Sequence, residues 1–257
     1  MSKKEQNSVE TKKRGKVFII APPSYLINAQ YYASIAEKLG YEVRLNETLE
    51  ANKSFIEIKN FNPNFIVMQV TFDKFRSQLE FLEKLKQNLP SIKIITAGEP
   101  FLTYNNNVTY ENPYIDYAIM GEVEYTLRDI LDGVPDCEIF GICYSNEYML
   151  AIKNEQRPCI ENLDNLPFPA RHISKDNKSI TIEVSRGCPC HCFFCLATPI
   201  NGNIVRMRST DSIIKELKEC IDKYNTKKVY FKSDLFNYDK TWVTTARETS
   251  TVIVSLK

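Results

Sequence analysis

Short apolar runs alternate with amphipathic segments along the first half of the chain. Residues 16–20 (KVFII) are apolar and end at Pro22 and Pro23, and the next apolar positions, within residues 32–39, recur at helical spacing before Gly40. This is the pattern of a strand, a loop and a helix. Its repetition predicts strands at residues 16–20, 42–45, 65–70, 92–95 and 114–120, and helices near residues 32–39, 54–60, 75–89 and 123–131.

Strands that are apolar throughout and alternate with helices indicate a parallel sheet covered on both faces. The predicted fold class is therefore α/β, with an N-terminal doubly wound sheet of the Rossmann or flavodoxin type. Ligands of such sheets bind beyond the carboxyl ends of the strands. Those ends fall here at residues 21–25, 71–72, 98–101 and 121–124. The first of these turns lacks the G-x-G-x-x-G sequence, which argues against a nicotinamide or flavin dinucleotide.

The chain divides into four predicted segments. Residues 1–15 are polar and predict a disordered tail, and residues 16–135 form the α/β domain. Residues 136–178 contain three prolines and short strand-like pieces at residues 139–143 and 148–152, which indicates a connector. The second folded unit takes residues 179–257.

Composition excludes several classes of protein. The 257 residues carry a net charge of +1, so nucleic acid is not an expected partner. No apolar stretch approaches the roughly 18 to 20 residues of a membrane span, and the start of the chain lacks a signal peptide. We therefore expect a cytoplasmic protein without a membrane partner, whose eight cysteines are reduced.

Four of the eight cysteines fall within Ser185 to Cys195 (SRGCPCHCFFC), directly after a predicted strand at residues 179–184. Cys188, Cys192 and Cys195 have the spacing C-x3-C-x2-C, and three thiolates can hold a [4Fe–4S] cluster whose fourth iron stays open. The alternative is a structural zinc site that also uses Cys190 and His191, but no second ligand pair with finger spacing follows.

The cysteine motif, with Ser-Arg-Gly before it and Phe194 before its last cysteine, resembles the radical S-adenosylmethionine enzymes. Residues 112–131 (NPYIDYAIMGEVEYTLRDIL) resemble the end of a cobalamin-binding domain, residues 163–171 (LDNLPFPAR) its connector, and residues 205–217 (VRMRSTDSIIKEL) the approach to the first barrel helix. The chain thus resembles the cobalamin-dependent radical S-adenosylmethionine family, which includes the anaerobic magnesium-protoporphyrin ester cyclases and many methyltransferases. The resemblance implies that the second unit is an incomplete (β/α) TIM-like barrel.

The resemblance also implies roles for individual residues. Cys188, Cys192 and Cys195 would bind the cluster, whose open iron would bind S-adenosylmethionine. Phe194, Ser233 and Asp234 would contact S-adenosylmethionine, and Gly98 and Gly121 would contact cobalamin. The expected partners are a small organic substrate and an electron donor such as flavodoxin or ferredoxin.

Two departures from the family pattern, and an alternative interpretation of two of its residues, qualify these expectations. The only histidines are His172 and His191, so cobalamin would bind without a histidine ligand from the α/β domain. Glu122 and Glu124 stabilise the following helix electrostatically in our interpretation, without touching a ligand. The residues from Ser179 onward allow only two to three βα units of about 30 residues each, so a C-terminal truncation is expected. Two functions stay open: an enzyme of radical transfer, methylation or cyclisation, and a non-catalytic remnant of one.

Overall fold

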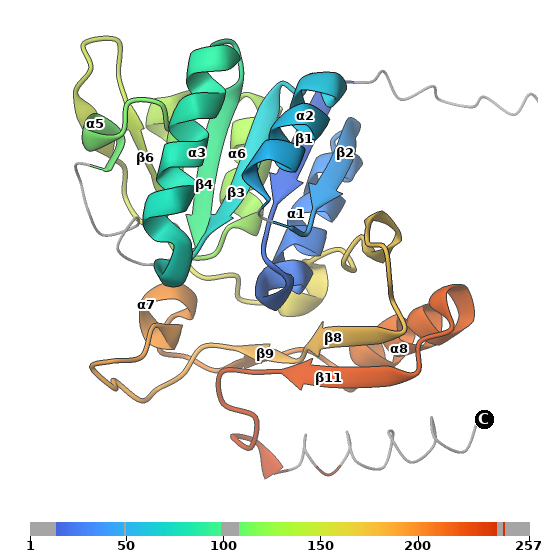
Figure 1. Cartoon of the computed structure of the whole chain (residues 1–257). Coiled ribbons are helices and arrows are strands. Elements are labelled where there is room, and N and C mark those ends of the chain that lie inside the picture. The colour runs from blue at the N-terminus through green and yellow to red at the C-terminus, as the bar shows by residue number, and fades with distance from the viewer. Residues whose placement is uncertain (1–13, 49, 99–107, 241–243, 245–257) are drawn as a thin grey trace, which may run out of the picture.

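A seven-stranded sheet with helices on both faces forms the larger part of the molecule (Figure 1). The computed structural model describes residues 14–48, 50–98, 108–240 and 244. The order of strands across the sheet is β2-β1-β3-β4-β5-β6-β7. The first five strands are parallel, whereas β6 and β7 are antiparallel to their neighbours. The strands are β1 (Gly15–Ile20), β2 (Tyr41–Asn46), β3 (Phe65–Val70), β4 (Lys93–Gly98), β5 (Tyr117–Ile119), β6 (Ile142–Ser145) and β7 (Ala151–Lys153).

Two apolar cores hold the helices to this sheet. Helices α1 (Leu26–Lys38) and α6 (Glu124–Asp132) pack on one face, and α2 (Ala51–Phe61) and α3 (Phe75–Asn88) pack on the other. A short helix, α5 (Val108–Glu111), precedes β5. Helix α6 ends where Gly133 adopts a φ of 81°, a conformation that residues with a side chain rarely adopt.

The order of the five parallel strands, 2-1-3-4-5, is that of flavodoxin-like folds. This confirms the predicted α/β fold class. The sheet nevertheless continues beyond residue 135, because β6, which follows α6, pairs antiparallel with β5, and β7 pairs antiparallel with β6. Only the β6–β7 connection is short and contains no helix, as antiparallel neighbours allow.

The connector also belongs to the first core. Ile160, Leu163, Leu166 and Ala170 are buried in the same apolar cluster as α1 and α6. The segment between the predicted domains is therefore packed against the sheet domain rather than extended through solvent.

A smaller unit lies against the carboxyl ends of the parallel strands, below them in Figure 1. Strand β8 (Ser179–Glu183), helix α8 (Thr210–Tyr224) and strand β11 (Lys228–Lys232) form one βαβ unit with parallel strands. Between β8 and α8 lie helix α7 (Ala197–Asn201) and two short antiparallel strands, β9 (Ser185–Arg186) and β10 (Arg206–Met207). The unit has a small core of its own around Ile182, Val184 and Leu217.

Three parts of the sequence predictions lie outside the described residues. These are most of the expected N-terminal tail (residues 1–13), the strand-end loop at residues 99–101, and the end of the last predicted segment (residues 241–243 and 245–257). Over the residues that are described, no helix is both long enough and apolar enough to cross a membrane.

Candidate functional site

A cavity of about 230 Å³ lies between the carboxyl ends of the parallel strands and the smaller unit. The sheet domain lines it with residues from α1 and from the ends of β3, β4 and β5, and the smaller unit lines it with residues from β8, β9, α7 and β11. The lining contains Tyr25, Asn28, Tyr32, Gln69, Gly98, Gly121, Glu122, Val123, Glu124, Glu183, Arg186, Leu196, Ala197, Ile200, Asn201, Lys232 and Asp234. This is the position at which flavodoxin-like sheets bind their ligands.

The sheet side of the cavity contains a buried polar pair. The Tyr32 hydroxyl of α1 donates a hydrogen bond of 2.9 Å to the side-chain oxygen of Gln69, at the end of β3. Burial raises the pKa of Tyr32, so its hydroxyl stays protonated and remains a donor. The pair fixes α1 to β3 beside the cavity.

Gly98 and Gly121 lie at the ends of the neighbouring strands β4 and β5, and both line the cavity. Their φ values are 116° and 74°, which favour glycine. A Cβ at Gly98 would lie 2.1 Å from the side-chain nitrogen of Gln69, whereas a Cβ at Gly121 would point toward Gln156 and the Ile200 carbonyl at 3.4 and 3.5 Å. A side chain at Gly121 would therefore take up space in the cavity.

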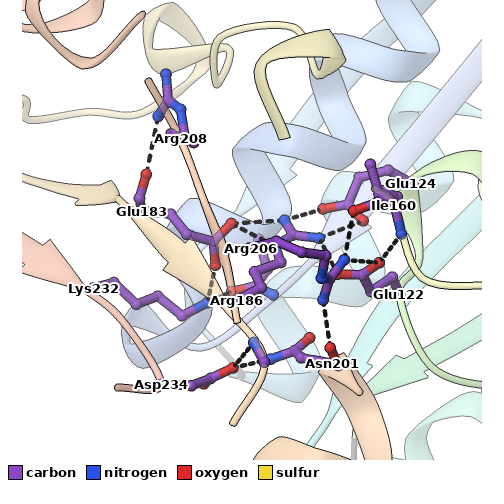
Figure 2. Close-up of polar contacts among 12 residues, drawn as sticks. Glu122, Glu124, Ile160, Glu183, Arg186, Asn201, Arg206, Arg208, Lys232 and Asp234 are labelled. Carbon is purple, nitrogen blue, oxygen red and sulfur yellow. Dashed lines mark hydrogen bonds and ion pairs between the residues drawn. The ribbon is translucent and has the colours of Figure 1, made fainter. Parts of the chain in front are cut away.

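A cluster of buried ion pairs joins the two halves of the cavity (Figure 2). The Arg186 guanidinium donates to both Glu124 carboxylate oxygens, at 2.6 and 3.1 Å, and to Glu122 at 3.3 Å. It also donates to Glu183 at 2.7 Å. Glu122 and Glu124 belong to the sheet domain, so Arg186 spans the interface.

Two further cations complete this cluster. Arg206, opposite Arg186 in the β9–β10 pair, lies 3.0 Å from the Glu122 carboxylate and donates to the Ile160 carbonyl at 2.6 Å. Lys232, opposite Glu183 in the β8–β11 pair, forms an ion pair of 2.9 Å with it. Three carboxylates thus meet three cations, and their formal charges cancel.

These contacts shift the ionisation of the buried groups. Burial opposes the charge on Glu183, but Arg186 and Lys232 outweigh this effect and lower its pKa to about 2. Burial likewise opposes the charge on Arg186, yet its glutamate partners raise its pKa well above the ordinary value. Glu183 and Arg186 are therefore both charged at neutral pH.

The cysteine loop begins two residues after Arg186. Cys188 is 8% exposed and donates its backbone N–H to the Gly202 carbonyl, whereas Cys190 and Cys192 are exposed. A hydrogen bond with Cys188 raises the pKa of the Cys190 thiol, and Cys192 and Cys195 add to this effect. The four thiols thus lie near one another on one loop, although among the described residues no three His, Cys, Asp or Glu side chains are arranged to hold a metal ion.

The residues predicted to contact S-adenosylmethionine are not all at the cavity. Asp234 lines it, and its Oδ2 accepts hydrogen bonds from the Gly187 N–H at 2.8 Å and from Asn201 at 2.9 Å. Ser233 forms a hydrogen bond with the Ser185 hydroxyl at 2.5 Å. Phe194 is 75% exposed, does not line the cavity, and packs edge to face against Phe193 at 5.4 Å. Asp234 and Ser233 therefore anchor the start of the cysteine loop.

Sequence reasoning missed the ion-pair cluster. Glu122 and Glu124 do lie at the start of helix α6 as expected, but they also pair with Arg186 and Arg206. A signal was present in the strands, because Glu183 and Gln69 are polar residues within otherwise apolar runs. Such residues are usually paired when buried.

Comparison with known families identifies the sheet domain. Residues 21–131 match the model of the B12 binding domain family. The match starts at the end of β1 and stops at the end of α6, so it includes both Gly98 and Gly121.

Curated relatives extend the similarity into the smaller unit. An uncharacterised methyltransferase of Pyrococcus horikoshii is 24% identical over 253 residues, which cover 88% of this chain and 54% of that protein. The cytidylyl-2-hydroxyethylphosphonate methyltransferase of Streptomyces wedmorensis is 21% identical, over 90% of this chain and 57% of that protein. The chain spans about half the length of these relatives.

Two solved structures share the fold. The cobalamin-dependent S-adenosylmethionine radical enzyme OxsB, with aqua-cobalamin and S-adenosylmethionine bound, matches 86% of this chain and 34% of its own, with a TM-score of 0.72 and 20% identity. The radical S-adenosylmethionine methyltransferase TsrM of Kitasatospora setae matches 91% of this chain and 50% of its own, with a TM-score of 0.67 and 14% identity. Residues 21–131 therefore match the B12 binding domain family, and the chain is similar in sequence to methyltransferases and has the fold of the corresponding part of cobalamin-dependent radical S-adenosylmethionine enzymes.

Proposed function

We propose that this chain binds cobalamin at the carboxyl ends of β4 and β5 and a [4Fe–4S] cluster at Cys188, Cys192 and Cys195, for methyl transfer that uses S-adenosylmethionine. The observation that carries the proposal is the cavity, which is lined from one side by the B12-binding domain and from the other by the unit that contains the cysteine loop. The methyltransferase relatives favour methylation over cyclisation or another radical transfer.

The types of residue around the cavity are suited to the corrin ring of cobalamin. Gly98 and Gly121 present backbone without side chains at two neighbouring strand ends. Of the described residues that line the cavity, none is a histidine, so the protein side would offer hydroxyl, amide and backbone groups rather than an imidazole. The role of Gly121 is to leave the cavity open at the end of β5.

The cysteine loop suits an iron–sulfur cluster by its donor set. Three thiols at C-x3-C-x2-C spacing are the ligands that such clusters use, and they lie together after a buried strand end. When bound, the cluster and cobalamin supply the one-electron and methyl-carrier chemistry, and the protein orients them. Asp234 and Ser233 serve this role by holding Gly187 and Ser185 at the start of the loop.

Cobalamin binding is tested most directly at Gly121. We expect Gly121→Ala to weaken binding of aqua-cobalamin at least tenfold in an absorbance titration, because the added Cβ would enter the cavity at a strained φ. Gly133→Ala is the matched control: its φ of 81° brings the same kind of strain, but nothing lies within 4 Å of the added Cβ, and Gly133 is not among the cavity residues. Equal affinity of the two variants would contradict a corrin site at β5.

The catalytic part of the proposal has its own test. We expect the chain reconstituted anaerobically with iron and sulfide to release 5′-deoxyadenosine or S-adenosylhomocysteine from S-adenosylmethionine. If the reconstituted chain binds both cofactors but releases neither product, the alternative of a non-catalytic remnant would hold instead. Zinc rather than iron in the isolated protein would favour a structural zinc site.

A further inference from the structure

Arg186 makes the largest set of ion pairs between the two halves of the cavity, with Glu122 and Glu124 on the far side. It is 4% exposed, and its five N–H groups face three carboxylates. Glu183 lies on the strand just before it, whereas Glu122 and Glu124 come from the end of β5 and the start of α6. Its guanidinium also lies 5.6 Å from the Tyr31 ring of α1.

This geometry requires arginine. Nη1 and Nη2 bind the two oxygens of Glu124 side by side while Nε binds Glu183, which uses the planar fork of the guanidinium in two directions at once. A lysine ammonium is a single point with a rotating set of donors, so it cannot hold both carboxylates in the same places. The contact therefore fixes an orientation as well as a charge.

The backbone between Arg186 and the cysteine loop has little freedom. Gly187, with a φ of 90°, packs so closely that an added Cβ would lie 2.1 Å from the Ile204 carbonyl oxygen, and its N–H is held by Asp234. Cys188 is then held by its own N–H bond to Gly202. A displacement of the Arg186 side chain is thus transmitted directly to Cys188.

The other end of the contact lies at the proposed cobalamin site. Glu122 directly follows Gly121, and Glu124 is the first residue of α6. Gly121, Glu122 and Glu124 all line the cavity. A ligand that shifts the end of β5 would therefore act on the partners of Arg186.

We infer that Arg186 is a positioning residue that sets the place of Cys188 relative to the end of β5 and so couples the cysteine loop to the occupant of the B12-binding domain. The positioning of Cys188 stands on the contacts above. Only the coupling to an occupant rests on the proposed function.

Positioning is tested on the metal-free chain by the rate at which iodoacetamide alkylates Cys188, with exposed Cys137, outside the cysteine loop, as the internal reference. Arg186→Gln should raise the relative rate for Cys188 at least tenfold, and Arg186→Lys should raise it less. Arg208→Lys is the control, because Arg208 is equally buried but is paired with Glu216, whereas Glu122 and Glu124 are paired with Arg186 and Arg206. An unchanged Cys188 rate in folded Arg186→Gln, or an equal rise in Arg208→Lys, would overturn the inference.

A double variant separates positioning from loss of stability. Arg186→Gln alone leaves buried carboxylates without their partner, and this is a strongly destabilising change. The double variant Arg186→Gln with Glu124→Gln removes one unpaired charge and should unfold at a higher temperature than Arg186→Gln. Its Cys188 should still be alkylated faster than in the wild type. If the double variant regained both stability and protection of Cys188, the effect would be on stability alone and the inference would be wrong.

Coupling is tested with aqua-cobalamin as the probe. In the wild type, saturating cobalamin should slow alkylation of Cys188 at least threefold beyond its effect on Cys137, and in Arg186→Lys this additional protection should disappear. Equal protection in both proteins would overturn the coupling through Arg186. A wild type that binds no cobalamin would contradict the proposed function, and the coupling with it, but would leave the positioning of Cys188 to be judged by the metal-free experiment.

Discussion

At the scale of single residues, the most strongly perturbed carboxylate of the cavity is Glu183. It lies in the interior at the end of β8, where burial alone would favour its neutral form. Arg186 and Lys232 reverse this preference, so ionised Glu183 stabilises the folded chain. The stability of the molecule should therefore depend on pH through this residue.

Because the folded pKa of Glu183, about 2, is lower than its ordinary value of 4.5, its contribution is complete above about pH 5 and is lost as the pH falls toward 2. We expect the free energy of unfolding of the wild type to fall more steeply over this range than that of Glu183→Gln, which should be less stable at neutral pH. Denaturant unfolding at several pH values measures both quantities. Exposed Glu161→Gln is the control and should keep the wild-type slope; the same slope in Glu183→Gln and wild type would contradict the assignment.

The cysteines differ in what their loss should do. Replacing Cys188, Cys192 or Cys195 by Ala should abolish the [4Fe–4S] content after reconstitution, because each supplies one of three ligands. Cys190→Ala should leave iron and sulfide content nearly unchanged, even though Cys190 lies beside Cys188. The cluster content of each variant is measured by iron and sulfide analysis and by the absorbance of the cluster. Loss of the cluster in Cys190→Ala, with retention in Cys188→Ala, would contradict the assignment of the ligands.

Bound cobalamin should have no histidine of this chain on cobalt. Residues 1–171 contain no histidine, and the His172 ring lies 2.8 Å from the Glu37 carboxylate of α1. His191 is exposed on the cysteine loop, and neither histidine lines the cavity. An electron paramagnetic resonance spectrum of the Co(II) form should therefore lack hyperfine splitting from a protein nitrogen, and His172→Ala should not alter it. A nitrogen splitting that changes when histidine is labelled with ¹⁵N, or that disappears when a histidine is replaced, would disprove this prediction.

At the scale of secondary-structure elements, periodicity predicted most of the sheet domain because its strands are apolar on both faces. The strand β3 was predicted at residues 65–70, where the structure has it, and Gly133 ends α6 as expected. β5 is shorter than predicted. The apolar side chains of Tyr114 and Ile115 pack in the core beside α3, but their backbone is not part of the sheet. Apolar character thus predicted burial more reliably than it predicted strand ends.

Short strands held by side chains were not predictable in this way. β9 and β10 have two residues each, and both contain an arginine whose place is set by Glu122 and Glu124 some 60 to 80 positions away. Local pattern contains no information about such distant partners. The cysteine spacing, in contrast, is local, so the resemblance to cobalamin-dependent radical S-adenosylmethionine enzymes was recognisable from sequence and is confirmed by the comparisons.

At the scale of the whole molecule, the two units differ in how they are stabilised. The sheet domain has an apolar core on each face, and the connector adds to one of them through Ile160, Leu163 and Leu166. The smaller unit has only six buried apolar residues in its core, and in the described part of the chain β11 pairs with β8 alone. Burial of apolar area is the main favourable term in folding, so the smaller unit depends more on its contacts with the sheet domain.

Those contacts include the buried ion pairs of Arg186 and Arg206 and the buried pair of Arg171 with Glu216, and breaking one buried pair costs about 3–5 kcal/mol. Limited proteolysis of the native chain should therefore remove the smaller unit first and leave a resistant fragment from near Gly15 to about Ile173, where the packed connector ends. Arg186→Gln should speed the first cleavage several-fold without shortening the lifetime of that fragment, whereas the exposed-site variant Lys223→Gln should cleave like the wild type. Mass spectrometry of the fragments measures both rates. A resistant fragment that ends near Pro135 would show that β6, β7 and the connector are not part of the stable domain. Equal cleavage rates of Arg186→Gln and wild type would show that the ion pairs of Arg186 do not hold the two units together.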